Sequence, residues 1–341
     1  MMNKLLKILI LSSTLSFISG CGHAASKAEQ EKGKTMIDVK NTQDWCLGRY
    51  TFKIPKEAQL MDESINFDTF KIKSTLKSSK AEFGAAIKEV ENKYSTKDDF
   101  IKDKTATETK NNISTKIIWG ETTYAGGRLP IEVFAFVFDA SNNTLFKIRG
   151  LYDKKFEKES VAGIKHIVQN LKARNNNLVP KEKGICFKNG FIKDDGSSYK
   201  FTRQSIGFKF PKAPTVMLNL ETEVRYKAED DVVTRTEKNL KSDPDYPKNI
   251  STIKTLRKGD KTANPSNPTS GIELVSEVGL DGGTGIFAVW EHQGKIKASM
   301  DPLFSVTLDS TRTNSYVKAS SIPNQNALQV YEAILNSIKK F

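Results

Sequence analysis

The feature that most constrains the fold is an order of landmarks that occurs twice along the chain. Cys46 is followed by the segment RYTFKIP, which ends at Pro55, and Cys186 is followed by SIGFKFP, which ends at Pro211. Both segments alternate apolar and polar residues with the period of a half-buried strand. The repeated order predicts an internal duplication, and therefore two related domains.

A polar connection separates the two repeats. Residues 173–184 read ARNNNLVPKEKG, with three consecutive asparagines, a proline and mixed charges. This composition is typical of a linker. The predicted domains are residues 45–172 and residues 185–341.

The two domains show the same predicted elements in the same order. In the first, strands are predicted at about 66–74, 114–119, 131–138 and 144–149, with helices at about 80–94 and 157–172. In the second, strands are predicted at about 216–225, 251–257, 272–278, 285–291 and 303–309, with helices at about 229–240 and 324–339. Ser79 is the predicted N-cap of the helix at 80–94. The pattern predicts an α+β fold of two related domains, each an antiparallel sheet with about two helices on one face.

The first 21 residues predict export and lipid attachment. Lys4 and Lys7 form a short positive start, and the apolar run over residues 8–18 is too short to span a bilayer. Small residues then lead into Cys21. This is the pattern of a bacterial lipoprotein signal over residues 1–20, in which the Cys21 thiol takes a diacylglyceryl group and the chain is cut before it. The alternative is an ordinary secretory signal with a cysteine nearby.

The mature chain is predicted to stay on a membrane, because a second acyl chain makes lipid attachment stable. Gly22 and His23 follow the lipidated cysteine, where an aspartate would favour the inner membrane. The inner leaflet of the outer membrane, facing the periplasm, is therefore the predicted location. Residues 21–44 are polar and predict a flexible tether.

Two cysteines remain after lipidation, Cys46 and Cys186. An exported compartment is oxidising, which favours a disulfide between them, and two separately buried thiols, one in each domain, are the alternative. The histidines His23, His166 and His292 show no ligand spacing with the cysteines, so no metal site is predicted. His166 lies beside the apolar stripe of its helix and is predicted to be packed or solvated.

The chain is basic, with 53 Lys and Arg against 40 Asp and Glu and a net charge of +13. The positive charges are spread along the chain, so a solvated surface is the favoured interpretation and an anionic partner is the alternative. Nucleic acid is an improbable partner for an exported chain.

No motif of catalysis or cofactor binding was found in the sequence. It has no G-x-S-x-G and no P-loop, and the glycine-rich segment 279–285 joins two strand-like runs as a hairpin turn would. Acidic pairs occur at Asp98-Asp99, Asp194-Asp195 and Asp230-Asp231, and they are predicted to lie in exposed turns or at helix N-termini. We therefore predict no catalytic residues, no enzymatic activity and no cofactor.

Four segments of the chain resemble parts of a known protein family. WCLGRYTFKIP (45–55) resembles the opening of that family's first domain, and GICFKNGFI (184–192) resembles the opening of its second. IFAVWEHQGK (286–295) and ALQVYEAILNSIKKF (327–341) resemble its later strands and closing helix. The family is that of the periplasmic immunity proteins against type VI secretion phospholipases of the fourth lipase-effector class. Lys53, Lys56 and Lys339 depart from the family pattern, so charge complementarity with a given effector does not carry over.

The resemblance implies a protein that binds its cognate lipase effector and covers that enzyme's active site. The contact residues are not implied. Three other classes stay open: a solute-binding lipoprotein, whose usual parallel strands are not predicted here; an envelope enzyme; and a surface adhesion module.

Overall fold

The structure is a computed structural model, and it describes residues 34–124, 127–242, 250–313 and 316–341. Lys34–Phe341 form one compact unit. The predicted signal (1–20) and Cys21 lie outside the described residues, as does the tether up to residue 33. Within the described residues, no helix is both long and apolar enough for a membrane span.

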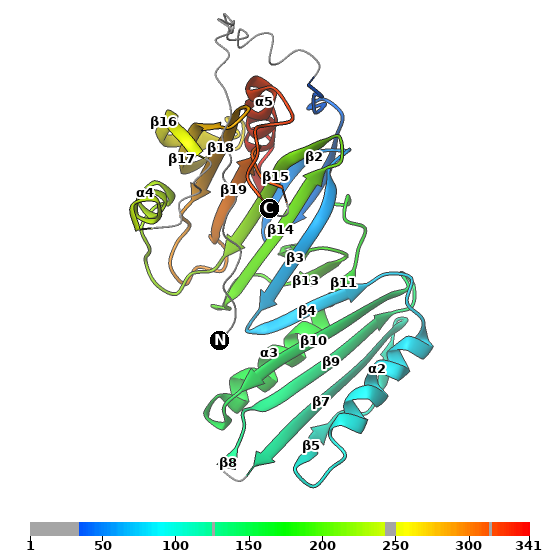
Figure 1. Cartoon of the computed structure of the whole chain (residues 1–341). Coiled ribbons are helices and arrows are strands. Elements are labelled where there is room, and N and C mark those ends of the chain that lie inside the picture. Colours follow the sequence, from blue (N-terminus) through cyan, green and yellow to red (C-terminus); the bar gives the residue numbers. More distant parts are fainter. Residues whose placement is uncertain (1–33, 125–126, 243–249, 314–315) are drawn as a thin grey trace, which may run out of the picture. The chain divides into compact units, whose positions relative to one another are not determined.

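Among the described residues, fourteen strands form one antiparallel sheet (Figure 1). The first half of the chain supplies β3 (Gln59–Phe67), β4 (Phe70–Thr75), β5 (Asp99–Lys104), β6 (Glu108–Lys110), β7 (Ile113–Tyr124), β8 (Gly127–Arg128), β9 (Ile131–Asp139) and β10 (Thr144–Tyr152). The second half supplies β14 (Thr202–Phe210), β15 (Ala213–Glu223), β16 (Ile250–Ala263), β17 (Thr269–Leu280), β18 (Gly283–His292) and β19 (Leu303–Asp309).

The two halves contribute the same strand order to this sheet. The first half runs β3-β4-β10-β9-β7-β5, and the second runs β14-β15-β19-β18-β17-β16. The two series meet where β3 pairs with β14, and Ser64 lies opposite Ser205 in that pair. The predicted α+β class and the repeated plan are both present in the structure.

The helices cover both faces of the sheet, so the prediction that they share one face was wrong. In the first half, α2 (Lys80–Lys93) packs on Phe136 and Phe138 of β9, whereas α3 (Glu157–Asn170) packs on Val133 and Val137. These are alternate residues of one strand, and alternate residues point to opposite faces. The nearly continuous apolar run of β9 reflects this burial on two sides.

The second half is arranged in the same way. On one face, α4 (Val232–Ser242) packs near Leu274 and Val289, and on the other α5 (Asn324–Leu335) packs near Val275 and Ala288. Each half therefore consists of a sheet with one helix on each side (Figure 1).

The N-terminus of α2 is fixed by the predicted cap. The Ser79 hydroxyl accepts a hydrogen bond from the Glu82 amide at 3.2 Å, and the Glu82 carboxylate accepts one from the Ser79 amide at 2.7 Å. This reciprocal pair satisfies two amides that would otherwise have no partner at the helix start.

Two predicted boundaries were wrong. The segment 66–74 is not one strand, because Asp68 (φ 50°) and Thr69 (φ 72°) turn the chain between β3 and β4. A two-residue turn preserves the alternation on either side of it, which hid the break. The closing helix ends at Leu335 rather than at 339, and β20 (Lys339–Lys340) pairs instead with β2 (Tyr50–Pro55).

Two small three-stranded sheets flank the large one. The first contains β1 (Thr42–Leu47), β2 (Tyr50–Pro55) and β20. The second contains β11 (Leu171–Ala173), β12 (Gly184–Phe187) and β13 (Gly190–Lys193). Each sheet thus combines the opening hairpin of one half with the strand that follows the closing helix of the other half.

The two hairpins, β1–β2 and β12–β13, are exchanged between the halves. Tyr50 and Phe52 from the first hairpin are buried in the core around α5, and Ile185 and Phe187 from the second are buried in the core around α3. Neither core is complete without residues from the other half. The boundaries 45–172 and 185–341 stay a prediction, and the exchange implies that they do not separate two independent cores.

Candidate functional site

The exchanged hairpins are joined to each other. The structure links Cys46 and Cys186 by a disulfide, with their Cα atoms 5.7 Å apart. Beside it, the Gly48 amide donates to the Cys186 carbonyl at 2.9 Å and the Cys186 amide donates to the Gly48 carbonyl at 2.8 Å. The two cysteines thus lie at the contact between the two halves, both fully buried.

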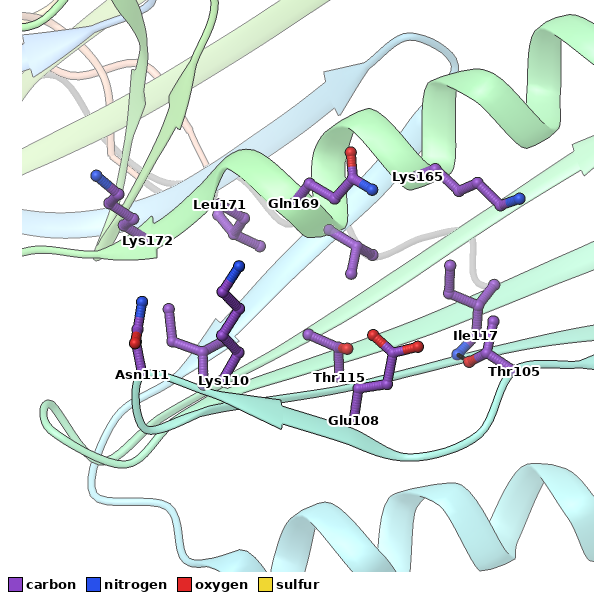
Figure 2. A pocket seen from close by; sticks show the side chains of 12 residues that line it. Thr105, Glu108, Lys110, Asn111, Thr115, Ile117, Lys165, Gln169, Leu171 and Lys172 are labelled. Atoms are coloured by element: carbon purple, nitrogen blue, oxygen red, sulfur yellow. Dashed lines mark hydrogen bonds between the residues drawn. The ribbon is translucent and has the colours of Figure 1, made fainter.

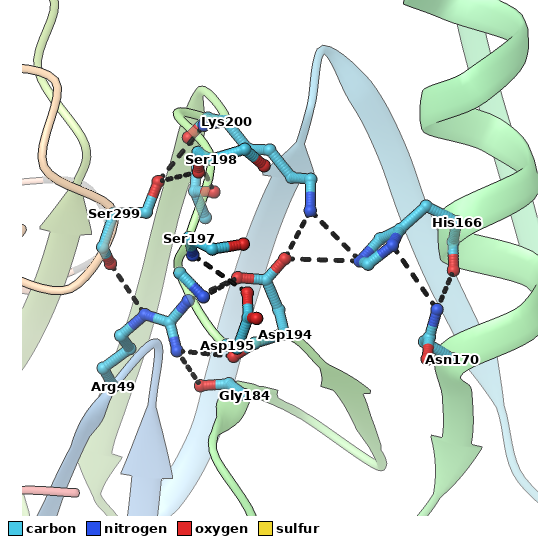
Figure 3. A network of polar contacts seen from close by, with 12 residues as sticks. Arg49, His166, Asn170, Gly184, Asp194, Asp195, Ser197, Ser198, Lys200 and Ser299 are labelled. Atoms are coloured by element: carbon cyan, nitrogen blue, oxygen red, sulfur yellow. Dashed lines mark hydrogen bonds and ion pairs between the residues drawn. The ribbon is translucent and has the colours of Figure 1, made fainter.

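A buried polar network lies at the same contact (Figure 3). Its centre is Asp194, just after the second hairpin, and it faces the fully buried Arg49 of the first hairpin, with Arg49 Nη2 2.5 Å from Asp194 Oδ1. The guanidinium also donates to the carbonyls of Asp194, Gly184 and Ser299, at 2.9, 3.2 and 2.7 Å. Arg49 thereby ties the first hairpin to three segments of the chain.

Two further side chains reach the other oxygen of the same carboxylate. Lys200 Nζ lies 2.5 Å and His166 Nε2 lies 3.3 Å from Asp194 Oδ2. Burial would raise the pKa of Asp194, but hydrogen bonds from His166 and Lys200 and the charges of Lys200 and Arg49 hold it well below its usual range. Asp194 is therefore an ionised anchor for both halves.

The prediction that the pair Asp194-Asp195 lies in an exposed turn was wrong for its first member. Asp194 is 4% exposed, whereas Asp195 is exposed as predicted. The local sequence DDGSS has the composition of a turn and gives no sign of an arginine 145 positions earlier in the chain. The available signal for Arg49 was its charge, because it lies in the alternating segment after Cys46. Nothing in the sequence indicated that Asp194 is its partner.

The network does not have the geometry of a hydrolase triad. His166 stacks on Phe67, with ring centroids 6.3 Å apart, and contacts Asp194, Lys200 and Asn170. Within the described residues, no hydroxyl or thiol forms a hydrogen bond with its ring. The arrangement holds segments together and lacks the nucleophile–base contact of nucleophilic catalysis.

The other candidate residues are structural. His292 contacts the Ser270 carbonyl at 2.8 Å and Asp301 at 3.2 Å. The Asp231 carboxylate caps the N-terminus of α4 by accepting a hydrogen bond from the Thr234 amide at 2.9 Å. Over the part of the chain that the structure describes, no three His, Cys, Asp or Glu residues gather as metal ligands would. The segment 279–285 forms the predicted hairpin turn between β17 and β18.

Two cavities border α3, one near each of its ends. The C-terminal one has a volume of about 620 Å³ (Figure 2) and is lined by polar and apolar side chains, with three lysines and one acidic residue, Glu108, among them. Its lining includes Ile113, Ile117, Val168, Leu171, Lys110, Lys165 and Lys172. The three lysines are exposed. This cavity can therefore offer positive charge to a partner.

The N-terminal cavity has a volume of about 900 Å³ and a different lining. Its lining comes from the β3–β4 turn, the end of β10 and the residues after it, α3 and the 198–200 loop, and it includes acidic and aromatic side chains beside His166 and Lys200. Among them are Asp68, Phe156, Glu159 and Tyr199. Neither cavity was predicted, because each combines residues that lie far apart in the sequence.

These features define a class of α+β protein, a duplicated antiparallel sheet whose halves are completed by exchanged hairpins. Residues 178–340 match the family model of the Tle cognate immunity protein 4 C-terminal domain, and this match confirms the resemblance carried by the four sequence segments. No curated protein sequence matches the chain.

Solved immunity proteins share the fold over both halves. The apo structure of TplEi, an immunity protein of the T6SS of Pseudomonas aeruginosa, superposes with a TM-score of 0.70 at 18% identity, covering 89% of this chain and 98% of that chain. The same protein complexed with an "L" peptide gives 0.68 at 18% identity, covering 89% and 99%. The Tle4–Tli4 complex gives 0.70 at 18% identity, covering 89% and 98%.

Proposed function

We propose that this chain is a lipid-anchored immunity protein that binds a type VI secretion phospholipase in the periplasm and blocks its active site. The producing cell would thereby be protected from the toxin of a neighbouring cell. The chain would do this without catalysing a reaction of its own.

The observation that carries the proposal is the family match over the second half, together with a shared fold that extends across both halves. One of the solved relatives is Tli4 in complex with Tle4. A protein that acts by occlusion needs a rigid surface, and the exchanged hairpins, the disulfide and the Asp194 network all make the contact between the halves rigid. An occluding interface of ordinary size buries about 1,600 Å².

The proposed anchor is the lipid on Cys21, which places the protein where an injected phospholipase would act. Each buried methylene of an acyl chain contributes about 0.8 kcal/mol of membrane affinity, so a multiply acylated cysteine does not dissociate. Cys21→Ser is expected to move the protein from the membrane fraction to the soluble periplasm. Sedimentation with membranes despite this substitution would contradict the anchor.

The function is tested by rescue. Cells that express the phospholipase encoded beside this gene, directed to the periplasm, are expected to survive when the full chain is co-expressed. The control is residues 21–341 retained in the cytoplasm, which is expected to give no protection. Lysis despite stable periplasmic expression of the full chain would contradict the proposal.

A further inference from the structure

The cavity at the N-terminal end of α3 has apolar side chains that water can reach. Leu151, Phe156 and Tyr199 line it with 57%, 51% and 44% of their surfaces exposed. Exposed aromatic side chains around a hollow are typical anchors of protein interfaces, because they bury a large apolar area at a small cost in side-chain entropy. The lining is therefore suited to the stem of a long side chain from another protein.

The same cavity is acidic, although the chain as a whole carries a net charge of +13. Asp68, Asp153 and Glu159 line it, and none of the three carboxylates forms a hydrogen bond or ion pair within the described part of the chain. Lys200 also lines the cavity, but its ammonium group is held 2.5 Å from Asp194. The free charge in this hollow is thus negative.

Of these three acidic residues, Asp68 packs most closely against the rest of the chain. Its backbone is fixed in the left-handed region (φ 50°) by the β3–β4 turn, and a Cβ atom at Gly163 of α3 would lie 2.3 Å from Asp68 Oδ2. Burial raises the pKa of Asp68, while the charges of Lys200 and His166 oppose that rise. A cation that entered the cavity would offset the energetic cost of burying the charged Asp68 carboxylate.

We infer that this cavity accepts a lysine or arginine side chain of the phospholipase effector. The cationic head would pair with Asp68 and Glu159, and the aliphatic stem would pack against Phe156 and Tyr199. This inference rests on the proposed function. The cavity at the other end of α3 has the opposite charge, so only the acidic cavity fits a cation.

The first experiment measures the affinity of the mature chain, carrying Cys21→Ser, for the purified effector. Asp68→Asn with Glu159→Gln is expected to weaken binding at least about tenfold, because it removes both charged partners while conserving shape. Tyr199→Ala is expected to weaken it about 5- to 30-fold. The controls are Asp260→Asn and Tyr316→Ala, exposed residues outside the cavity lining, which are expected to leave affinity unchanged.

The second experiment tests the cavity without the effector. N-acetyl-arginine amide is expected to shift the NMR resonances of Tyr199 and Phe156 in the wild-type chain and not in the Asp68→Asn, Glu159→Gln variant. N-acetyl-citrulline amide, which has nearly the same shape without the charge, is expected to shift neither.

The outcomes separate this inference from the proposed function. If the wild-type chain binds the effector and the cavity variants bind it with an affinity within about twofold of the wild-type value, the inference about the cavity is contradicted and the proposed function stands. If the wild-type chain does not bind the effector but arginine amide binds the cavity selectively, the function is overturned and the cation site stands. If citrulline amide binds as well as arginine amide, the charge argument fails. Thermal unfolding of each variant shows that any loss is not a loss of fold.

Discussion

The two halves of this protein share one strand order and differ in how their closing helices are buried. In the second half, α5 is enclosed, and Val330, Tyr331 and Ile334 are 0% exposed. In the first half, α3 buries only part of its surface and borders both cavities. With the same strand order, the second half thus encloses its closing helix, whereas the first half leaves part of its closing helix exposed beside two cavities.

The exchanged hairpins explain how the halves can differ without separating. Each hairpin closes the core of the opposite half, and the disulfide and Arg49–Asp194 pair lie where the hairpins meet. The duplicated unit is therefore not an autonomous domain.

The largest expected effect comes from separating the halves. Residues 34–180 and 181–341, expressed alone, are each expected to fail to fold, because each lacks the hairpin that completes its core. Mixed together, they are expected to restore cooperative unfolding, since the cut lies in an exposed connection. Circular dichroism melts check both results. Cooperative unfolding of either fragment alone would show that the exchange is dispensable.

The next largest effect is expected at the central carboxylate. Asp194→Ala leaves Arg49 buried without its charged partner and is expected to lower the free energy of unfolding by about 3–5 kcal/mol. The matched control is Asp195→Ala at the exposed neighbouring residue, expected to cost less than about 0.5 kcal/mol. Urea denaturation measures both, and equal losses would contradict the role given to the network.

Removing the disulfide should show how far the exchange depends on a covalent bond. Cys46→Ala with Cys186→Ala is expected to lower the free energy of unfolding by about 2–5 kcal/mol while leaving the fold intact. Mass spectrometry without reductant checks that the bond forms. If reduction of the wild-type chain causes no similar loss, the bond does not stabilise the contact between the halves.

The smallest effect is expected at Glu63, on β3 where the two halves of the sheet meet. Burial raises the pKa of Glu63 to about 7, with the charge of Lys188 opposing the rise. The folded state therefore binds this proton more tightly, and the resulting stability is present below the ordinary carboxyl pKa and lost as the pH rises to about 7.

Glu63→Gln cannot lose a proton and can still accept the Lys188 amide, which lies 3.1 Å from the carboxylate. It is expected to be more stable than the wild-type chain at pH 8 by about 1–2 kcal/mol and equal to it at pH 4. Glu89→Gln, at an exposed position on α2, is the control. A difference that does not change with pH would contradict the buried titration.

Local pattern was sufficient for most elements. The amphipathic stripes and Ser79 predicted α2 and α3, and the alternating runs predicted the strands around the Asp281-Gly282 turn. These features depend on neighbours within a few residues, and such neighbours are visible in the sequence. The short strands β5 and β6 were missed, because they are mostly polar and exposed.

Long-range pairings could not be predicted in the same way. The exchange of hairpins places Tyr50 in the core around α5, which begins 324 − 50 = 274 residues later in the chain, and no local pattern encodes that pairing. The burial of Asp194 and the cavity around Asp68 depend likewise on partners brought together by the fold. The disulfide was one of two alternatives until the Cα positions of Cys46 and Cys186 were known.

The exchange also dictates when the chain can finish folding. The first hairpin needs α5 to cover it, and β2 pairs with Lys339 and Lys340, which follow α5. The core around α5 therefore cannot close until α5 has been made, whereas the core around α3 needs the chain only as far as the second hairpin. The first hairpin, one of the earliest of the described segments to be made, therefore stays uncovered until α5 has been made.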